Sequence, residues 1–500
     1  MDETGAQAPR RVFGFHVPGR SILLAMAFFA VVCVALTAMA PQKRTGDSGE
    51  YMAMTWNLTH LRPPALSLED IARLDQHLAS LEPGMTGFAG SVPTHSGLES
   101  GGRYDMLHFW TYSLVASPFV AVANVLDVPD TYGFAACNIA MFTFAFGVLL
   151  RRRGAVAAVL LCCSPFLWFI DKPHTEVMIG SAVLLALLWR HDRPLWGAAA
   201  AALAMSQNIS LAPMFAVYAA ALVVEHRGSL VATPLRRWAV AGVAALVVVH
   251  PLYYLVRFGD IDPVPVMTGK QAELPSVRGM LTPVVDPYVG LVTWWPGLLA
   301  VPAVAGFVAA WRRRPQHRTW QEWVMVWLPA AVAVMILAGQ AQSPEPGSGG
   351  TFAMTRYALW LAPCLVCWMD RSLFTGRVVR GTVVGLVAAS VVLSFHVARP
   401  SRPDIWFSVG PTWVSDAVNE HAPWLWDPPP QVFLTREWRQ FTLVEPVANE
   451  ACTKLLAIQG RWPATCEAPH DPPAWCTAAT FCYANRVGDE WWYREAAYHG

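Results

Sequence analysis

Two carboxylates follow closely on the first apolar stretch of the chain. Residues 46–51 read Gly-Asp-Ser-Gly-Glu-Tyr, which places Asp47 and Glu50 three residues apart. On a helix, side chains at this spacing share one face. A carboxylate at a membrane surface can act as a general base or hold a metal ion. The structural alternative is a helix start, since Asp is a favoured N-cap and Glu suits the first turn.

Two more polar groups border apolar segments. Arg103 and His108 stand where a long apolar run begins, and residues 171–176 (Asp-Lys-Pro-His-Thr-Glu) lie between two such runs. Polar side chains at membrane depth are costly unless they line water or a site. Arg103, His108, Lys172 and His174 are therefore candidate substrate-binding residues. The structural alternatives are an interfacial anchor for the first group and a plain surface turn for the second.

Three basic residues are expected on the outer side of the membrane. Arg356 follows the glycine-rich segment 347–350, and Lys270 and Arg278 lie in the loop 257–287. Basic residues normally concentrate in cytoplasmic loops, so outer ones need a reason. A guanidinium presents a planar fork of donors that matches a phosphate. These residues are candidates for phosphate binding, and contact with lipid headgroups is the alternative.

The charge balance and the missing motifs exclude several function classes. The chain has 36 Lys and Arg against 35 Asp and Glu, so it has no basic surplus for binding nucleic acid. No Walker A, Gly-x-Ser-x-Gly or His-Glu-x-x-His motif is present. The cysteine spacings match no zinc pattern, and we expect neither a metal nor another cofactor.

The elements that must position these residues lie in a membrane. Of 500 residues, 54% are hydrophobic and 14% are charged, and the mean hydropathy is +0.35. Soluble domains carry about 25% charged residues, so this composition excludes both disorder and a set of soluble domains. The apolar residues form blocks of membrane-spanning length. The sequence therefore predicts an all-α polytopic membrane protein with about 11–12 transmembrane helices.

Twelve apolar segments are candidate membrane helices. They are residues 21–40, 107–126, 133–150, 155–170, 174–189, 194–206, 208–224, 238–256, 288–310, 322–339, 357–369 and 379–396. Cytoplasmic turns are marked by basic clusters at 151–153, 190–193, 236–237, 312–314 and 371–380. Twelve crossings return the C-terminal tail to the cytoplasm, whereas eleven leave it outside. The pair 107–126 and 133–150 is joined without a basic residue, so one of the two is a candidate for a partial or re-entrant segment.

Polar segments flank the predicted membrane domain, which spans residues 21–396. Residues 1–20 form a cytoplasmic N-terminus, and residues 41–106 form a first periplasmic loop. Within that loop, apolar residues recur at helical spacing over 67–81. This pattern predicts an amphipathic helix lying on the membrane surface. Residues 397–500 form a small C-terminal domain.

The ten cysteines fall into two groups. Six lie inside apolar segments, where a buried thiol needs no special explanation: Cys33, Cys137, Cys162, Cys163, Cys364 and Cys367. The other four lie close together in the polar tail: Cys452, Cys466, Cys476 and Cys482. This second group predicts two disulfides in an oxidising compartment, with free thiols as the alternative.

Taken in order, these motifs resemble those of the GT-C glycosyltransferases over roughly residues 20–370. The matching segments are the Gly-Asp segment 46–53, the segment 104–118 with its His and Pro, the Asp-Pro-Tyr-Val-Gly-Leu segment 286–296, and the Gly-Gly to Arg-Tyr segment 349–363. Enzymes of this superfamily are polytopic and use a polyprenyl-phosphate-linked sugar. Protein O-mannosyltransferases and lipid A aminoarabinose transferases are related members.

The resemblance implies a multi-pass glycosyltransferase of the bacterial inner membrane, with its active site and C-terminal domain in the periplasm. Asp47 would be the general base, and Glu50 is the second candidate because the usual acidic neighbour of Asp47 is Ser48 here. Arg356, Lys172 and the loop cations would stabilise the leaving lipid phosphate in an inverting transfer. The implied partners are a polyprenyl-phosphate-linked sugar donor, a glycan, lipid or protein acceptor, and the bilayer.

Two departures from the family pattern concern the donor site. Residues 206–208 are Ser-Gln-Asn where many relatives carry a cation, and His108 is followed by Phe109 and Trp110 in place of a proline pair. A membrane transporter or lipid-linked glycan flippase also has polar residues at membrane depth, and is an alternative. A non-catalytic envelope assembly factor of the same fold is a third class. The long first loop and the cysteine-containing tail favour the enzyme over the transporter.

Overall fold

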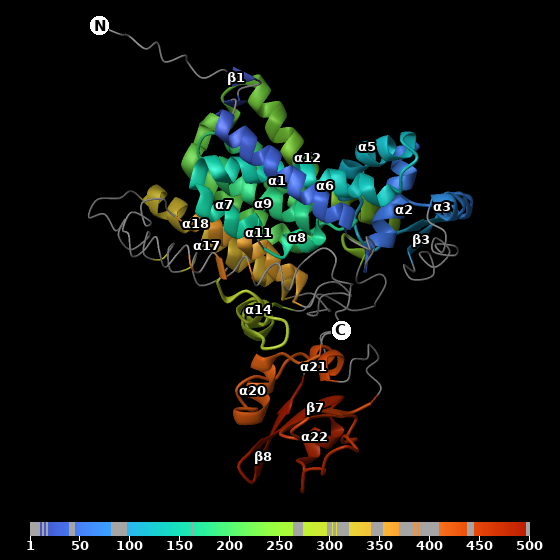
Figure 1. Ribbon diagram of the computed structural model, residues 1–500, viewed down its shortest axis with the longest axis vertical. Coiled ribbons are helices and arrows are strands. Elements are labelled where there is room, and N and C mark those ends of the chain that lie inside the picture. Colours follow the sequence, from blue (N-terminus) through green and yellow to red (C-terminus); the bar gives the residue numbers. More distant parts are fainter. Residues whose placement is uncertain are drawn as a thin grey trace.

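Figure 1 shows a large helical part and, beside one end of it, a small C-terminal unit that contains a sheet. This computed structural model describes residues 11–12, 15–16, 19–39, 46–81, 98–162, 164–263, 274–297, 303, 307, 320–341, 354–369, 385, 388–389, 392, 410–437 and 445–496. Candidate span 379–396 lies largely outside the described residues, and span 288–310 is described only over 288–297, 303 and 307. Those two spans stay predictions.

Long apolar helices support the prediction of a membrane protein. Among the described residues, four are long and apolar enough to cross a membrane: α1 (Arg20–Met39), α6 (Asp130–Arg153), the run Ile209–Val231 around α11 (Ala212–His226), and α12 (Pro234–Phe258). Further helices complete the bundle: α5 (Thr111–Val125), α7 (Ala155–Cys162), α8 (Phe166–Phe169), α9 (Glu176–Trp189), α10 (Pro194–Gln207), α17 (Trp320–Gln340) and α18 (Leu361–Trp368). Short helical pieces join them: η1 (Ile209–Leu211), η2 (Arg227–Val231), α14 (Val277–Val285), α15 (Leu291–Trp294) and η3 (Arg356–Trp360).

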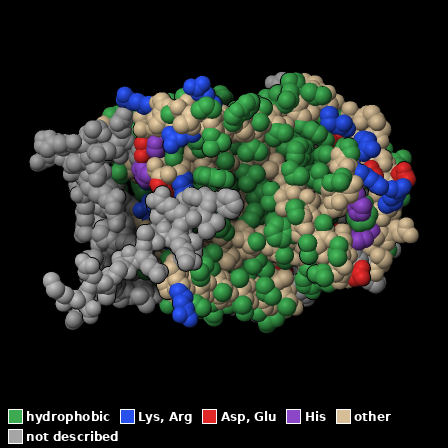
Figure 2. All heavy atoms as spheres, turned by 90° about the horizontal axis from the view of Figure 1, so that it is seen from above, with side chains coloured by type: hydrophobic (Ala, Val, Ile, Leu, Met, Phe, Trp, Pro, Cys, Tyr) green, Lys and Arg blue, Asp and Glu red, His purple; other side chains and the backbone are tan. Residues whose placement is uncertain are grey.

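One face of the helical part is largely apolar, as a lipid-facing surface must be. Figure 2 shows a face covered largely by hydrophobic side chains, with charged side chains gathered toward its margins. Helix α12 packs on α10 but is mostly exposed, and its exposed apolar residues include Leu235, Trp238 and Val256. In water such a continuous apolar surface would be unfavourable, so it marks the surface that contacts lipid.

Helix α6 runs antiparallel to α1, and α5 covers only one end of α6. Phe29 of α1 stacks on Phe146 near the C-terminal end of α6, at 4.8 Å between ring centres. The hydroxyl of Tyr112, at the start of α5, donates to Asn138 at 3.0 Å, and Gly133 faces Val120. Helix α5 therefore packs along the first turns of α6, away from its arginine-rich C-terminal end.

The apolar segment 155–170 is broken, although we expected a single helix there. Helix α7 ends at Cys162 and the short helix α8 begins at Phe166. Pro165 has no N–H to continue a helix, and the Ser164 hydroxyl accepts the N–H of Phe166 at 3.4 Å. Asn138 then donates to three carbonyl groups of the following turn, those of Phe169, Ile170 and Lys172. One buried amide thus satisfies a turn that would otherwise leave polar groups unpaired inside the bundle.

The first outer loop contains a helix where one was predicted, and its apolar face packs on protein. Helix α3 (Leu68–Leu81) buries Ile71, Leu74 and Leu78 against α2 (Ser48–Thr59) and α5. Asp70 fixes this arrangement, because it accepts hydrogen bonds from Ser67 and Arg62. The apolar stripe of α3 therefore packs on protein. The loop also holds a hairpin of β3 (Leu98–Ser100) and β4 (Arg103–Asp105), and β1 (Arg11–Val12) pairs with β2 (Phe15–His16) near the N-terminus.

The C-terminal unit, described over residues 410–437 and 445–496, contains a sheet that we did not predict. Four antiparallel strands pair in the order β5 (Val447–Ala448), β6 (Lys454–Ile458), β7 (Phe481–Val487) and β8 (Glu490–Glu495). Three helices accompany them: α20 (Trp413–His421), α21 (Pro430–Glu437) and α22 (Ala474–Ala478).

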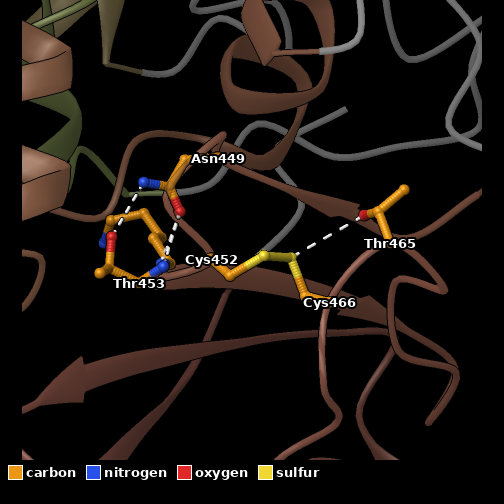
Figure 3. Close-up of a disulfide and its surroundings, with 6 residues drawn as sticks. Asn449, Cys452, Thr453, Thr465 and Cys466 are labelled. Atoms are coloured by element: carbon orange, nitrogen blue, oxygen red, sulfur yellow. Dashed lines mark hydrogen bonds between the residues drawn. A yellow bond between two sulfur atoms is a disulfide. The ribbon is translucent and has the colours of Figure 1, made fainter.

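The two predicted disulfides are present in this unit. They join Cys452 to Cys466 and Cys476 to Cys482. Figure 3 shows the turn that presents Cys452, in which Asn449 accepts the N–H of Thr453 at 3.0 Å and donates to its hydroxyl at 2.9 Å. Because disulfides form in oxidising compartments, these bonds indicate an extracytoplasmic location for this unit.

Candidate functional site

Helix α2 presents both carboxylates that the sequence singled out. Asp47 stands at the N-cap position of α2, and Glu50 lies in its first turn. The Asp47 side chain makes no capping hydrogen bond, so the structural alternative of a helix cap does not explain it. Both carboxylates are mostly buried and face residues from other segments. The face of α2 that carries both carboxylates forms one wall of the candidate site.

Arg356 meets Asp47 from the far end of the chain. Its Nη1 lies 2.5 Å from Asp47 Oδ2, and its Nε lies 3.6 Å from Glu176 Oε1. Its Nη2 donates to the hydroxyl of Tyr357 at 3.2 Å. The guanidinium is buried, with two carboxylates as its counter-charges. A buried charge is tolerated only with such partners.

His108 connects the two acidic residues of α2. Its Nε2 lies 3.3 Å from Asp47 Oδ2, and its Nδ1 lies 3.1 Å from Glu50 Oε2. The backbone N–H of His108 also donates to Glu50 Oε2, at 3.0 Å. Glu50 thus holds the loop before α5 in place while His108 bridges to Asp47.

A second histidine completes the cluster from the turn before α9. His174 Nδ1 lies 3.0 Å from Glu176 Oε2, and both side chains are fully buried. The ring of Tyr51 packs between the two histidines, with ring centres 5.6 Å from His108 and 6.0 Å from His174. The site therefore draws on four separate segments of the chain, which are the start of α2, the loop before α5, the turn before α9, and η3.

The charges of the cluster shift the pKa values of Asp47 and His108. Burial alone would raise the pKa of Asp47, but the neighbouring Arg356 and His108 hold it well below its ordinary value. Burial alone would lower the pKa of His108, but Asp47 and Glu50 raise it to about 9. At neutral pH Asp47 is therefore ionised and His108 carries a proton.

A small cavity opens beside Arg356. It is lined by Tyr51, His108, Thr175, Glu176, Gln207, Asn208, Arg356, Tyr357 and Trp360. The indole N–H of Trp360 is buried and has no hydrogen-bond partner among the described residues. The Asn208 side-chain oxygen accepts from Ser210, at 2.7 Å from its hydroxyl, so its amide group keeps donors to offer. Neutral donors thus stand next to the guanidinium, and residues 206–208 supply no second cation there.

Five of the predicted site residues meet in this cluster: Asp47, Glu50, His108, His174 and Arg356. Lys172 has its Nζ 2.7 Å from Asp171 Oδ1 and lies 4.2 Å from the centre of the Trp168 ring. The pair with Asp171 accounts for the position of Lys172.

The other predicted cations lie elsewhere. Arg103 donates to the carbonyl of Ala65 at 2.9 Å and lies 3.4 Å from Asp70, so it helps to fold the first loop. Arg278 lies 5.7 Å from the Trp426 ring, at the junction with the C-terminal unit. Lys270 lies outside the described residues.

Three contributors were not among the predicted site residues. Glu176 was visible as part of a polar segment, but its role as the second carboxylate beside Arg356 depends on folding. Tyr51 was part of the segment 46–53 but had no assigned role, and Trp360 read as an ordinary apolar residue of a helix. Among the described residues, no group of three His, Cys, Asp or Glu side chains is arranged to hold a metal ion.

Comparison of the chain with protein-family models, curated proteins and solved structures finds no match. The function must therefore be argued from the arrangement of the site itself.

Proposed function

We propose that this protein is a membrane glycosyltransferase that moves a sugar from a polyprenyl-phosphate carrier to an acceptor hydroxyl. The observation that carries the proposal is the contact between Asp47 and Arg356, with His108 against the same carboxylate. It unites a proton acceptor and a phosphate-matching cation in one buried cluster of a membrane protein. The choice of a sugar as the transferred group comes from the resemblance of the motifs to GT-C enzymes.

In the proposed reaction, the acceptor hydroxyl attacks the anomeric carbon of the donor. The bond between that carbon and the phosphate oxygen breaks, and its electron pair leaves with the lipid phosphate. The hydroxyl proton passes to Asp47. Arg356 stabilises the charge that develops on the phosphate. One displacement inverts the anomeric centre, and no step requires a cofactor.

The pairing of base and cation also suggests how the base becomes active. While Arg356 contacts Asp47, the low pKa of Asp47 makes it a weak base. A donor phosphate that draws the guanidinium toward itself would weaken this contact and raise the pKa of Asp47. Under this proposal, the base gains strength when the donor is bound.

The cavity beside Arg356 suits the oxygen atoms of such a substrate. The free indole N–H of Trp360 and the amide of Asn208 can donate to a hydroxyl or phosphate oxygen. They would take part of the role that a second cation has in related enzymes.

Contacts between helix ends support an assignment of the segments to two sides of the membrane. Arg153, at the end of α6, donates to the carbonyl of Met369 after α18, and His226 contacts the carbonyl of Arg190 at 2.7 Å. These residues come from the basic clusters that mark the cytoplasmic side. On the opposite side, Arg257 in the last turn of the long α12 contacts Asp105 of the first outer loop at 2.6 Å.

These contacts favour eleven crossings, with α5 as the segment that does not cross. Helix α5 lies along the outer turns of α6, near His77 of α3, which is 3.1 Å from Asp130. If α5 does not cross, eleven of the predicted spans remain. An odd number of crossings leaves the C-terminal unit outside, where its disulfides are stable. We therefore place the active site and the C-terminal unit on the periplasmic side of a bacterial inner membrane.

The test is transfer of radiolabelled sugar from polyprenyl-phosphate donors in membranes that contain wild type, Asp47→Asn or Glu69→Gln. Glu69 is an exposed acidic residue of the same loop and serves as the matched control. The proposal expects transfer by wild type and Glu69→Gln, and a loss of at least ~10²-fold in Asp47→Asn, as removal of a general base requires. Formation of both disulfides in each variant reports correct folding.

Two results would contradict the proposal. Equal transfer by Asp47→Asn would remove Asp47 from the mechanism and direct attention to Glu50. Absence of transfer by wild type with every donor sugar would reject the enzyme class and favour the transporter, flippase or assembly-factor alternatives.

A further inference from the structure

We infer that the C-terminal unit positions Arg356, through a relay of hydrogen bonds that runs from Trp426 through Asp286 and Val289 to Thr355. This inference rests on the proposed function only in treating Arg356 as the cation of the active site. In these terms Trp426 and Asp286 are positioning residues, and the site has its described geometry only while the C-terminal unit is docked.

The relay begins where the C-terminal unit meets the loop after α14 (Figure 1). Trp426 Nε1 donates to Asp286 Oδ2 at 2.8 Å. The other carboxylate oxygen of Asp286 accepts the backbone N–H groups of Tyr288, at 2.8 Å, and Val289, at 3.1 Å. Asp286 is fully buried, so each of these bonds is sheltered from water. One carboxylate thus ties a side chain of the C-terminal unit to a turn of the helical part.

Three further contacts seal the same junction. The Tyr288 hydroxyl donates to Glu437 at 2.6 Å and contacts the amide of Asn419. The Thr412 hydroxyl donates to the carbonyl of Pro287 at 2.7 Å. Tyr288 and Val289 also belong to one apolar cluster with Val432 and Phe433 of α21. The turn 286–289 therefore packs as part of the C-terminal unit's own core.

The relay ends at the active site. The carbonyl of Val289 accepts the N–H of Thr355 at 3.0 Å, and the next residue is Arg356. The turn has little freedom to yield, because a Cβ at Gly290 would lie 2.6 Å from backbone atoms of Asp286. A shift of the C-terminal unit would therefore be transmitted to the backbone that carries the guanidinium, rather than absorbed in the turn.

Two tryptophans of the C-terminal unit give a matched pair of variants. Trp426→Phe removes only the indole N–H bond to Asp286 and keeps an aromatic ring beside Arg278. Trp424→Phe changes an exposed tryptophan two residues away, which makes no hydrogen bond within the described part of the chain. Tyr288→Phe breaks the junction independently, by deleting the hydroxyl bond to Glu437.

The measurement is hydrogen–deuterium exchange of the full-length protein in detergent, which needs no enzymatic activity. We expect Trp426→Phe and Tyr288→Phe to speed exchange in peptides covering 286–290 and 354–360 by at least ~10-fold, since local opening then costs less. Peptides from β6, β7 and α9 should exchange as in wild type, which shows that both parts remain folded. Trp424→Phe should match wild type throughout.

The outcomes separate this inference from the proposed function. If the 354–360 peptide keeps its wild-type exchange rate in both Trp426→Phe and Tyr288→Phe, the coupling does not exist, whatever the transfer assay shows. If the exchange changes as expected while no transfer is found for wild type, the coupling stands and only the proposed function is lost. If both hold, the variants should lower kcat more than they raise KM, because they misplace a group that acts in the transition state.

Discussion

Asp47 and Arg356 are separated by 309 residues in the sequence, and their side chains meet at 2.5 Å. Each satisfies a requirement of the other. The buried guanidinium needs a counter-charge, and the carboxylate needs a partner that keeps it ionised in a mostly buried place. The pair therefore stabilises the fold and also contains the two groups that the proposed reaction uses.

The first prediction concerns the strength of this pair. Arg356→Gln should destabilise the protein by about 3–5 kcal/mol, because Asp47 and Glu176 lose their shared counter-charge. The double variant Asp47→Asn/Arg356→Gln should recover part of that loss, which a double-mutant cycle on unfolding free energies would measure. Arg73→Gln is the control, since Arg73 pairs with Glu69 on an exposed surface and should change stability by no more than about 0.5 kcal/mol. Additive effects of the two single substitutions would contradict the coupling.

The second prediction is a pH dependence carried by His108. Its pKa in the folded protein is about 9, raised from 6.5 by Asp47 and Glu50 despite burial. The stabilisation from the protonated ring is therefore complete below pH 6.5, declines as the pH rises, and is lost above about pH 9. The gap in melting temperature between wild type and His108→Gln should shrink over that range.

A control separates this effect from general alkaline unfolding. His470 lies on the surface of the C-terminal unit, and His470→Gln should follow wild type at every pH. A gap between wild type and His108→Gln that stays constant from pH 6 to pH 10 would show that His108 is not protonated by its neighbours.

Local features of the fold were predictable from the sequence because each depends on neighbouring residues. Apolar runs predicted the long helices, spacing predicted the helix 68–81, and cysteine content predicted the two disulfides. The surface that buries Ile71 and Leu74 was not predictable, since an amphipathic stripe fits a membrane surface and a protein surface equally well. The tail sheet was missed because its strands are short and interrupted by turns.

The site was predictable residue by residue but not as an arrangement. Asp47, Glu50 and Arg356 stood out by type and position, because charged residues next to membrane segments require a reason. That Arg356 meets Glu176, whereas Lys172 pairs with its own neighbour Asp171, depends on contacts across the folded chain. Sequence spacing carries no information about such contacts.

The third prediction concerns Asn138, which holds the turn before His174. Asn138→Leu should destabilise the protein by more than about 3 kcal/mol, because the Tyr112 hydroxyl and the carbonyls of the turn lose a buried partner. The control is Asn124→Leu in α5. The Asn124 oxygen is buried and has no hydrogen-bond partner among the described residues, so this change should be neutral or stabilising. Unfolding in a denaturing detergent measures both, and equal losses would contradict the role of Asn138.

The fourth prediction compares two helical glycines. A Cβ on Gly339 of α17 would lie 1.8 Å from the carbonyl oxygen of Ser210, so Gly339→Ala should force α17 away from η1 and destabilise the protein by several kcal/mol. A Cβ on Gly242 of α12 meets no atom within 4 Å. Gly242→Ala should therefore be neutral or raise stability by about 0.5–1 kcal/mol, as helix propensity requires. Thermal unfolding checks the pair, and equal effects would show that α17 does not approach η1 so closely.

The wide separation of Asp47 and Arg356 has a consequence for biosynthesis. The ribosome delivers Asp47, Glu50, His108 and Glu176 to the membrane long before Arg356 emerges. During that interval the carboxylates stand without their guanidinium partner. Under the proposed function, activity would begin only after the segment that carries Arg356 has been inserted, so incomplete chains would not act on the carrier lipid.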